Sequence, residues 1–542
     1  MTATATRASG PAPAPARERA GQLTGTAILL RLALRRDRLV MPLWVLVIAV
    51  MVSSGANTIR TLYDTPAERA QAAASMASNA SLRALYGPVF DPSVGGLVAW
   101  RFGVFAALLA GAMSLVVVVR HTREEEETGR QELLSAARVG RHAPLAAALV
   151  AALIANAAVA LLVAGALASS TGDTAGSLAL GLAIGASGAF FAGTAAVTAQ
   201  LTESARLAKG LAAAVLGAAF ALRAAGDAGT SDASSVLNWV SPLGWAENVR
   251  PYAGERWWLL LVLAASALAL MAAARFLSGR RDVGMSFLAT RAGPATGRLS
   301  TAYGLAWRLQ RGSVLGWTLG FLAAGVLFGG MTSGVGDLVA GNEQTKEIFQ
   351  RMGGQQGLSE AFLAAVVGML GMVAALYVVS SILRLHGEET SQRAEPVLAG
   401  AVGRLRWAAG HLVIAFGGTV LLMVVFGCAL ALGYGRDLGP ILGAALAQLP
   451  AIWLLGGLTV LLYGAFPRAA AASWGVVGLC LAIGWIGPAL DLPRPVLNLS
   501  PFAHLPKLPG AELSWPPLLL LTALAVLLTA AGLAGLRRRD VG

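Results

Sequence analysis

The residues best suited to specific polar chemistry form two short charged segments that match each other. Five positions coincide without a gap: Glu125, Glu126, Arg130, Glu132 and Arg141 fall on Glu388, Glu389, Arg393, Glu395 and Arg404. Carboxylates and guanidinium groups in such a pattern are suited to charge-assisted hydrogen bonds at an interface. Each segment lies between two long apolar runs. A charged loop repeated in two hydrophobic halves predicts a duplicated membrane protein whose functional parts are these loops.

The sequence lacks the common catalytic and metal-binding motifs. None of the three lysines, Lys209, Lys346 and Lys507, follows a glycine, so the P-loop signature is missing from the sequence. The five histidines are scattered, and no HExxH, GxSxG or paired Cys/His spacing occurs. Cys428 and Cys480 lie inside apolar runs, which argues against a disulfide framework or a thiolate metal site. We therefore expect no enzyme activity, metal or cofactor in this chain.

The first charged segment has the spacing of a helix start. Thr122 and Glu125 match the S/T-x-x-E capping box, in which both side chains satisfy backbone N–H groups. The matching segment has Gly387, a weaker start, and Pro396, which we expect to end or bend the helix. A solvated turn is the alternative for a single Glu/Arg loop, but the duplication favours two short cytoplasmic helices.

Composition determines the class of protein that carries these loops. Of the residues, 56% are hydrophobic and 13% are charged, and apolar runs of about 20 residues recur throughout. The chain is therefore predicted to be an all-α polytopic membrane protein with about 12 transmembrane helices. The expected spans are residues 39–56, 95–119, 143–168, 175–200, 207–225, 257–277, 314–332, 361–383, 407–434, 440–465, 469–489 and 516–536.

The basic residues predict the orientation and the domains. The net charge of +13 is concentrated in loops that fall on one side, which indicates cytoplasmic loops and termini in the inner membrane rather than nucleic-acid binding. The halves are then parallel six-helix repeats. We expect a disordered cytoplasmic tail at 1–21, a first transmembrane half at 22–284, a cytoplasmic linker at 285–300 and a second half at 301–542. Arg280-Arg281-Asp282-Val283-Gly284 recurs as Arg538-Arg539-Asp540-Val541-Gly542.

Two further groups of charged residues stand out. Residues 22–38 predict a basic amphipathic helix at the inner membrane surface, with Arg31, Arg35 and Arg38 on one face, and a solvated flanking helix is the alternative. Arg308 and Arg311 match the last two of these arginines before the seventh span. Within the spans, ionisable groups are few: the candidates for a substrate path are Arg101, Arg223 and Asp227, with snorkelling to the interface as the alternative.

These residues resemble the ABC-2-type permeases of actinobacterial polyketide antibiotic exporters, the tetronasin-transport-like group in which both halves are fused. The resemblance is carried by the E-E-E-x-x-G-R-x-E-L-L segment with Val139-Gly140-Arg141 behind it, by its second copy, by Ser241-Pro242-Leu243-Gly244-Trp245 and by the R-R-D-V-G ends. It implies a type V exporter-like fold. It also implies that residues 120–141 and 384–406 are coupling helices that bind two copies of a cytoplasmic ABC ATPase, which would hold ATP and Mg²⁺. The set implied for coupling is Glu124, Glu125, Glu126, Arg130, Glu132, Arg141, Glu388, Glu389, Arg393, Glu395 and Arg404.

The resemblance implies that residues 22–38 and 299–311 are connecting helices, and that the chain is the permease of an ATP-driven exporter of lipophilic or amphipathic compounds such as antibiotics and drugs. The second copy departs from the pattern, because Gln392 replaces Gly129 and Glu395-Pro396-Val397 replaces Glu132-Leu133-Leu134. An ion-coupled secondary multidrug transporter is the main alternative. A membrane transferase using the acidic residues Asp64, Glu68 and Asp91 is the other.

Overall fold

The computed structural model describes residues 21–135, 139–282, 284–288, 301–339, 354–435, 438–486 and 493–539. These residues form helices, with no β-strand among them, and 11 of the helices are long and apolar enough to cross a membrane. The predicted all-α polytopic fold is confirmed. Of the twelve expected spans, the run at 469–489 is the one not among these 11: it contains α21, described over Ala472–Ile486, and residues 487–489 lie outside the described residues.

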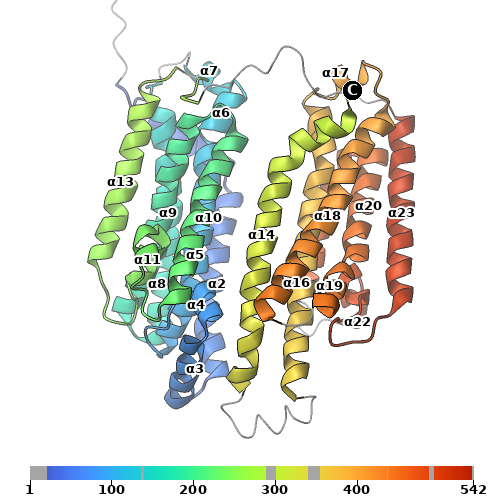
Figure 1. Ribbon diagram of the computed structural model, residues 1–542. Helices are drawn as coiled ribbons and strands as arrows, with labels where there is room; N and C mark the ends of the chain where they lie inside the picture. Colours follow the sequence, from blue (N-terminus) through green and yellow to red (C-terminus); the bar gives the residue numbers. More distant parts are fainter. Residues whose placement is uncertain are drawn as a thin grey trace, which may run out of the picture. The chain divides into compact units, whose positions relative to one another are not determined.

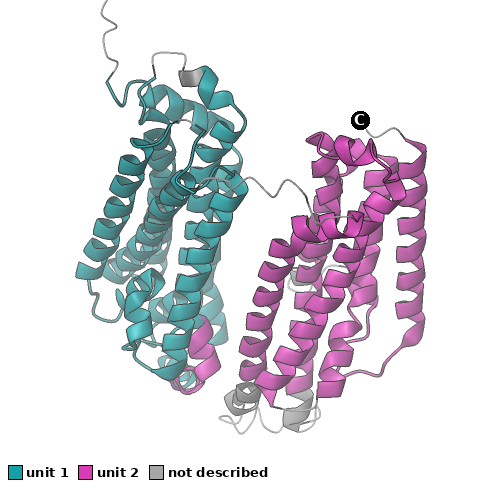
Figure 2. Cartoon of the chain, turned by 45° about the horizontal axis from the view of Figure 1, so that its top comes forward, with its two compact units in different colours: residues 1–73, 86–291 teal, residues 74–85, 292–542 magenta. Residues whose placement is uncertain are grey.

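The chain divides into two compact units. Unit 1 contains Met1–Ala73 and Tyr86–Arg291, and unit 2 contains Ala74–Leu85 and Ala292–Gly542. Figure 2 shows that the segment 74–85 takes the colour of unit 2 although it precedes the second span in sequence. The units therefore differ from the predicted halves by this one exchanged segment.

The described residues of the first half of the chain form thirteen helices. In order they are α1 (Thr26–Arg36), α2 (Val40–Leu62), α3 (Pro66–Ser78), α4 (Ala80–Tyr86), α5 (Val94–Arg120), α6 (Arg123–Glu127), α7 (Arg130–Ser135), α8 (Ala143–Thr171), α9 (Thr174–Leu201), α10 (Ala205–Gly229), α11 (Val236–Val240), α12 (Pro242–Asn248) and α13 (Trp258–Ser278).

Helix α9 forms the centre of unit 1. It packs against α5, α8, α10 and α13, and it has the largest buried share of the candidate spans. Small residues permit this close approach: a Cβ atom on Gly181 would lie 2.4 Å from the carbonyl oxygen of Ala160 in α8, and one on Gly185 would lie 3.0 Å from that of Asn156. Close backbone contact at small residues replaces the hydrophobic effect as the force that holds helices together in lipid.

The second half contains α14 (Ala302–Val339), α16 (Gly354–Thr390), α17 (Glu395–Leu398), α18 (Arg404–Tyr434), α19 (Leu438–Leu446), α20 (Leu449–Ala465), α21, α22 (Arg494–Leu497) and α23 (Trp515–Arg538), with 3₁₀ turns at Pro467–Ala469 and Pro501–His504. Helix α16 packs against α14, α18, α20 and α21. Its Tyr377 is fully buried and donates a hydrogen bond to the carbonyl oxygen of Ile414 in α18 (3.0 Å). The core of unit 2 is therefore built around α16 and α18.

The helices before the first and seventh spans differ. Residues 22–38 contain a separate helix, α1, which ends before Asp37, whereas the expected separate helix at 299–311 is absorbed into the continuous helix α14. The separate-helix prediction is therefore wrong for the second copy. In the sequence match Asp37 corresponds to Gln310, and aspartate favours helix ends whereas glutamine is a good helix former. Figure 1 shows that the first turns of α14 run obliquely to the rest of the helix.

Three of the polar segments between the spans contain short helices among the described residues. Helices α3 and α4 lie in the segment 57–94, α11 and α12 in the segment 236–256, and α22 in the segment 490–517. Most of the expected tail at 1–21, most of the linker at 285–300, and Val283, Asp540, Val541 and Gly542 of the matched ends lie outside the described residues.

Candidate functional site

In unit 1 the first charged loop is joined to the end of the sixth predicted span. Glu126 of α6 accepts two hydrogen bonds from Arg281, which follows α13: Nη2 to Oε1 at 2.6 Å and Nη1 to Oε2 at 2.8 Å. Each side chain is only 7% exposed. Figure 1 shows α6 at the same end of the unit as the end of α13. A two-point ion pair between planar groups fixes both distance and orientation.

Three further groups hold this pair in place. Arg123, which is 1% exposed, donates to Glu126 Oε2 (2.7 Å) and to the carbonyl oxygen of Ala199 in α9 (2.9 Å). Arg281 also donates from Nε to the side chain of Gln200 (2.7 Å), and Arg141 donates to the carbonyl oxygen of Arg281 (2.8 Å). The loop is therefore attached to α9 and to the end of α13.

Unit 2 repeats the arrangement with the matching residues. Glu389, near the end of α16, accepts two hydrogen bonds from Arg539 after α23, at 2.6 and 2.7 Å. Arg404 donates to the carbonyl oxygen of Arg539 (2.5 Å), as Arg141 does to that of Arg281. Tyr463 of α20 donates a further hydrogen bond to Glu389 (2.7 Å). Burial lowers the pKa of Arg539, but the hydrogen bonds and charge of Glu389 outweigh this effect and raise that pKa above its ordinary value.

Three other glutamates of the charged segments also form ion pairs within their own unit. Glu124 accepts a hydrogen bond from Lys209 (2.9 Å). Glu125 pairs with Arg36 of α1 and, at 3.3 Å, with Arg130. Glu388 pairs with Arg384 one turn earlier in α16 (2.8 Å).

The side chains that face solvent lie further along each segment. Arg130, Glu132 and Leu133 are exposed in or beside α7, and Arg393, Glu395 and Pro396 are exposed in or beside α17. Each charged segment therefore has an internal part, built on the glutamates that precede the turn, and an exposed part that begins with Arg130 or Arg393.

Two expectations about these segments are wrong. Thr122 does not cap a new helix, because its hydroxyl donates to the carbonyl oxygen of Val118 in the preceding helix (2.7 Å) and its side chain accepts no capping hydrogen bond. Pro396 does not end a helix but lies in the first turn of α17. Proline is tolerated there because the first N–H groups of a helix have no partner within it.

Gly129 and Gln392 occupy the same left-handed turn in the two segments, with φ of 72° and 57°. A side chain disfavours this conformation by ~1–2 kcal/mol relative to glycine. We predict that Gln392→Gly raises the free energy of unfolding by about 1 kcal/mol, measured by thermal unfolding of the purified protein in detergent. Gln71→Gly, within α3, serves as the control and is expected to lower it. A decrease with Gln392→Gly would contradict the strain argument.

Helix α1 is joined to the same end of unit 1. Asp37, which is 2% exposed, forms an ion pair with Arg120 (2.9 Å) and lies 2.6 Å from His121 Nε2. Arg31, Arg35 and Arg38 are exposed, and so are the apolar side chains of Ile28, Leu32 and Leu39. An exposed helix with both kinds of side chain fits a position on a membrane surface. Arg308 and Arg311 are exposed on α14.

The candidate path residues do not form one group. Arg223 and Asp227 of α10 are fully buried and pair with each other (3.2 Å) and, through Arg223, with Glu247 of α12 (3.1 Å). Asn238 of α11 donates to Asp227. Arg101 is exposed, and its guanidinium lies 4.9 Å from the centre of the Tyr86 ring. Burial with partners favours a specific role for Arg223 and Asp227, whereas Arg101 fits the interfacial alternative.

Sequence reasoning missed Arg281 and Arg539 as partners, and Asp37, Lys209 and Glu247 altogether. A signal was present for the two arginines, because the R-R-D-V-G ends are repeated together with the glutamates. Two of the three acidic candidates for a transferase have structural roles: Glu68 accepts hydrogen bonds from N–H groups just before α3, and Asp91 accepts one from the N–H of Ser93. Among the described residues no group of three or more His, Cys, Asp or Glu side chains is arranged to hold a metal ion.

The fold and the anchored loops define a multi-pass helical membrane protein in which polar segments are held rigidly at the ends of its spans. The chain belongs to the family described as "Multidrug efflux system permease Rv1217c, C-terminal domain", whose sequence model matches residues 29–277 and 299–537. It is 44% identical over 551 residues to the multidrug efflux system permease protein Rv1217c of Mycobacterium tuberculosis (strain ATCC 25618 / H37Rv), with 100% of both chains covered.

Proposed function

We propose that the chain is the permease subunit of an ATP-driven, ABC-2-type exporter that moves lipophilic or amphipathic compounds, drugs among them, out of the cell. Its relative is named as a multidrug efflux permease. In this proposal the chain hydrolyses no ATP itself, and two copies of a cytoplasmic ATPase bind its two charged segments. Both segments and both termini face the cytoplasm, as the basic loops favour.

The observation that carries the proposal is the recurring anchor. In each unit a glutamate of the charged segment binds an arginine at the end of the last span, Glu126 with Arg281 and Glu389 with Arg539. A loop held this way moves together with the spans, so a force applied to its exposed part is transmitted to the helices. This is the mechanical property that a coupling helix requires. The recurrence also supports an internal duplication with two docking positions.

The anchors also assign different roles to the charged residues. We infer that Glu126, Glu389, Arg141 and Arg404 position the segments and that Arg130, Glu132, Arg393 and Glu395 contact the ATPase. Complementary charges at an interface contribute to orientation and rate of association. The two short helices differ in sequence, because α17 has Pro396 in its first turn where α7 has Leu133. The two docking positions are therefore expected to differ in shape.

The test is co-purification from the native membrane in mild detergent, with mass spectrometry to identify a bound P-loop ATPase. The variant combines Arg130→Glu, Glu132→Arg, Arg393→Glu and Glu395→Arg, which reverses exposed charges and leaves the anchors unchanged. We expect loss of the ATPase and a fall of about tenfold or more in ATP-dependent efflux of a lipophilic dye, since ~1.4 kcal/mol of lost interface energy is a factor of ten.

The matched control is Arg494→Glu with Glu512→Arg, which reverses two exposed charges near α22. It should retain both the ATPase and transport, and both variants should unfold at the wild-type temperature. An ATPase that stays bound to the fourfold variant would contradict the docking assignment. Wild-type chain that binds no ATPase, under conditions that preserve a known complex, would contradict the ATP-driven mechanism.

An ion-coupled multidrug transporter is the second candidate. The observation that favours it is the pair of buried carboxylates of Asp227 and Glu247, since proton-driven transporters use such groups as relays. The two mechanisms are distinguished in cells by dye efflux under two treatments. Efflux that stops with a protonophore and continues after ATP depletion would support ion coupling, and the reverse result would support the ABC mechanism.

A further inference from the structure

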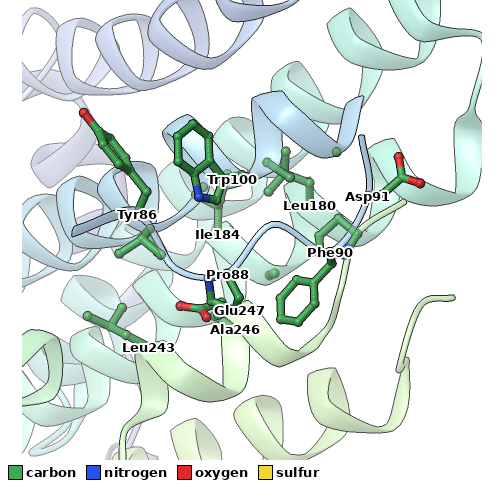
Figure 3. Close-up of a pocket in the computed structure, with 17 residues that line it drawn as sticks. Tyr86, Pro88, Phe90, Asp91, Trp100, Leu180, Ile184, Leu243, Ala246 and Glu247 are labelled. Atoms are coloured by element: carbon green, nitrogen blue, oxygen red, sulfur yellow. The ribbon is translucent and has the colours of Figure 1, made fainter. Parts of the chain in front are cut away.

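Unit 1 contains a pocket with aromatic walls and acidic groups, formed by the segment before α5 together with α5, α9 and α12. Its walls include Tyr86, Trp100 and Phe90, and two carboxylates, Glu247 and Asp91, reach it. Figure 3 shows Tyr86 and Trp100 on one side, Phe90 on the other, and the Glu247 carboxylate beside Pro88 and Leu243. The remaining wall is apolar. Apolar walls with a few polar groups are typical of sites for small organic molecules.

The Glu247 carboxylate is held in place by its surroundings. Its side chain is 7% exposed, and Oε2 accepts a hydrogen bond from Arg223 (3.1 Å). Gly87 touches it from the opposite side: a Cβ atom there would lie 2.8 Å from Cδ of Glu247, and the φ of 92° also favours glycine. The indole of Trp100 donates to the carbonyl oxygen of Gly87 (2.8 Å) and fixes this contact.

The charges around Glu247 do not balance. Arg223 Nη1 lies 3.2 Å from Asp227 and 3.1 Å from Glu247, so one guanidinium serves two carboxylates. Oε1 of Glu247 accepts no hydrogen bond from any residue that the structure describes. Burial raises the pKa of Glu247 above its ordinary value, Arg223 opposes the increase, and Asp227 adds to it. One more positive charge is needed when both carboxylates are ionised, and a proton is the smallest ion that supplies it.

The other charged groups near the pocket are Asp91, Arg101 and Arg250. Asp91 lines the pocket, Arg250 lies 4.5 Å from the centre of the Phe90 ring and Arg101 lies 4.9 Å from that of Tyr86. Neither arginine forms an ion pair with Glu247 in the described structure. Their guanidinium groups lie over the rings of these two wall residues, and the extra negative charge remains at Glu247 and Asp227.

We propose that this pocket binds a lipophilic monovalent cation, a quaternary or protonated amine attached to an aromatic group, and that binding releases the proton shared by Glu247 and Asp227. No covalent bond to the ligand forms: the O–H bond of the carboxyl group breaks, its electron pair stays on the carboxylate, and the proton passes to solvent. The carboxylate and the faces of Tyr86 and Trp100 then surround the cation. That this cation is a transported compound rests on the proposed export function, but its binding to the pocket does not.

The test is isothermal titration of the full-length chain in lipid nanodiscs, without any ATPase, with benzyltrimethylammonium as the probe. Titrations in two buffers of different ionisation enthalpy give the number of protons released, which we expect to be near one while Glu247 is protonated. Lowering the pH protonates the carboxyl group, so affinity should fall, by up to about tenfold per pH unit. Binding without proton release, or affinity that does not depend on pH, would overturn the proposal.

Glu247→Gln should reduce the affinity at least tenfold and abolish the proton release. Glu255→Gln, in the same polar segment but outside the pocket, is the matched control and should change neither. Neopentylbenzene, the neutral isostere of the probe, should bind wild type and Glu247→Gln equally and so report an intact pocket. If Glu247→Gln does not fold, Asp227→Asn tests the same proposal. This variant keeps Glu247 beside Arg223 but removes the second carboxylate, so cation binding should no longer release a proton. Unchanged cation affinity in a folded Glu247→Gln variant would refute the site without affecting the proposed docking of an ATPase.

Discussion

Replacing Arg223 with methionine is expected to lower the free energy of unfolding by about 3–5 kcal/mol, the usual cost of removing one partner from a buried ion pair. The side chain is fully buried and serves both Asp227 and Glu247. Without it the two carboxylates face each other in a site that excludes water. Thermal unfolding of the purified protein in detergent, followed by the melting temperature and by size-exclusion chromatography, measures the loss.

Arg206→Met is the matched control, because Arg206 lies exposed on the same helix, α10. It should change the melting temperature little. Adding Asp227→Asn to Arg223→Met removes one of the uncompensated charges and should recover a substantial part of the loss. A folded Arg223→Met protein with wild-type stability would show that the carboxyl groups are neutral in the resting state and that the arginine contributes nothing to holding them.

Exchanging the charges of Glu389 and Arg539 gives the second large effect. Each single reversal, Glu389→Arg or Arg539→Glu, places like charges together in a contact that is mostly shielded from water, and we expect it to cost about 3 kcal/mol or more. The double exchange restores opposite charges at the same positions. Tyr463, which donates to Glu389 in the wild type, can accept a hydrogen bond from an arginine there.

The double exchange should therefore regain at least half of the lost stability and of the transport activity, as measured by unfolding and by dye efflux. Glu512→Arg, an exposed reversal in unit 2 outside the charged segments, is the control for general effects of charge and should leave stability and efflux unchanged. If the double variant loses as much free energy of unfolding as the two single variants lose together, the two residues are not coupled.

Much of this architecture could be predicted from the sequence. Apolar runs separated by polar segments locate eleven of the twelve expected spans, because length and hydropathy are sufficient for that assignment. The run 469–489 is not among them, because its helix α21 is described only as far as Ile486. The glycine-rich span at 175–200, whose hydropathy is among the lowest of the candidate spans, is the central helix α9, because its small residues permit packing.

The roles of the charged residues were harder to predict. Glu126 and Arg281 lie 155 residues apart, and no local pattern links them. The glutamates were expected to face an ATPase, but the structure pairs them within their own unit and exposes the residues that follow the turn. Thr122 shows the same limit: its spacing fits a capping box, yet its hydroxyl bonds to the helix before it. Periodicity and spacing in the sequence predict local structure, but they do not predict which residues far apart in the sequence form ion pairs after folding.

The exchanged segment 74–85 has a practical consequence for dissecting this protein. The chain passes from one compact unit to the other at residues 73–74, 85–86 and 291–292. It therefore crosses between the units three times and not only once, at the linker. A polypeptide ending at residue 288 would carry a piece that belongs to unit 2, and a polypeptide starting at residue 301 would lack that piece. The two half-chains should consequently fold better when co-expressed than alone.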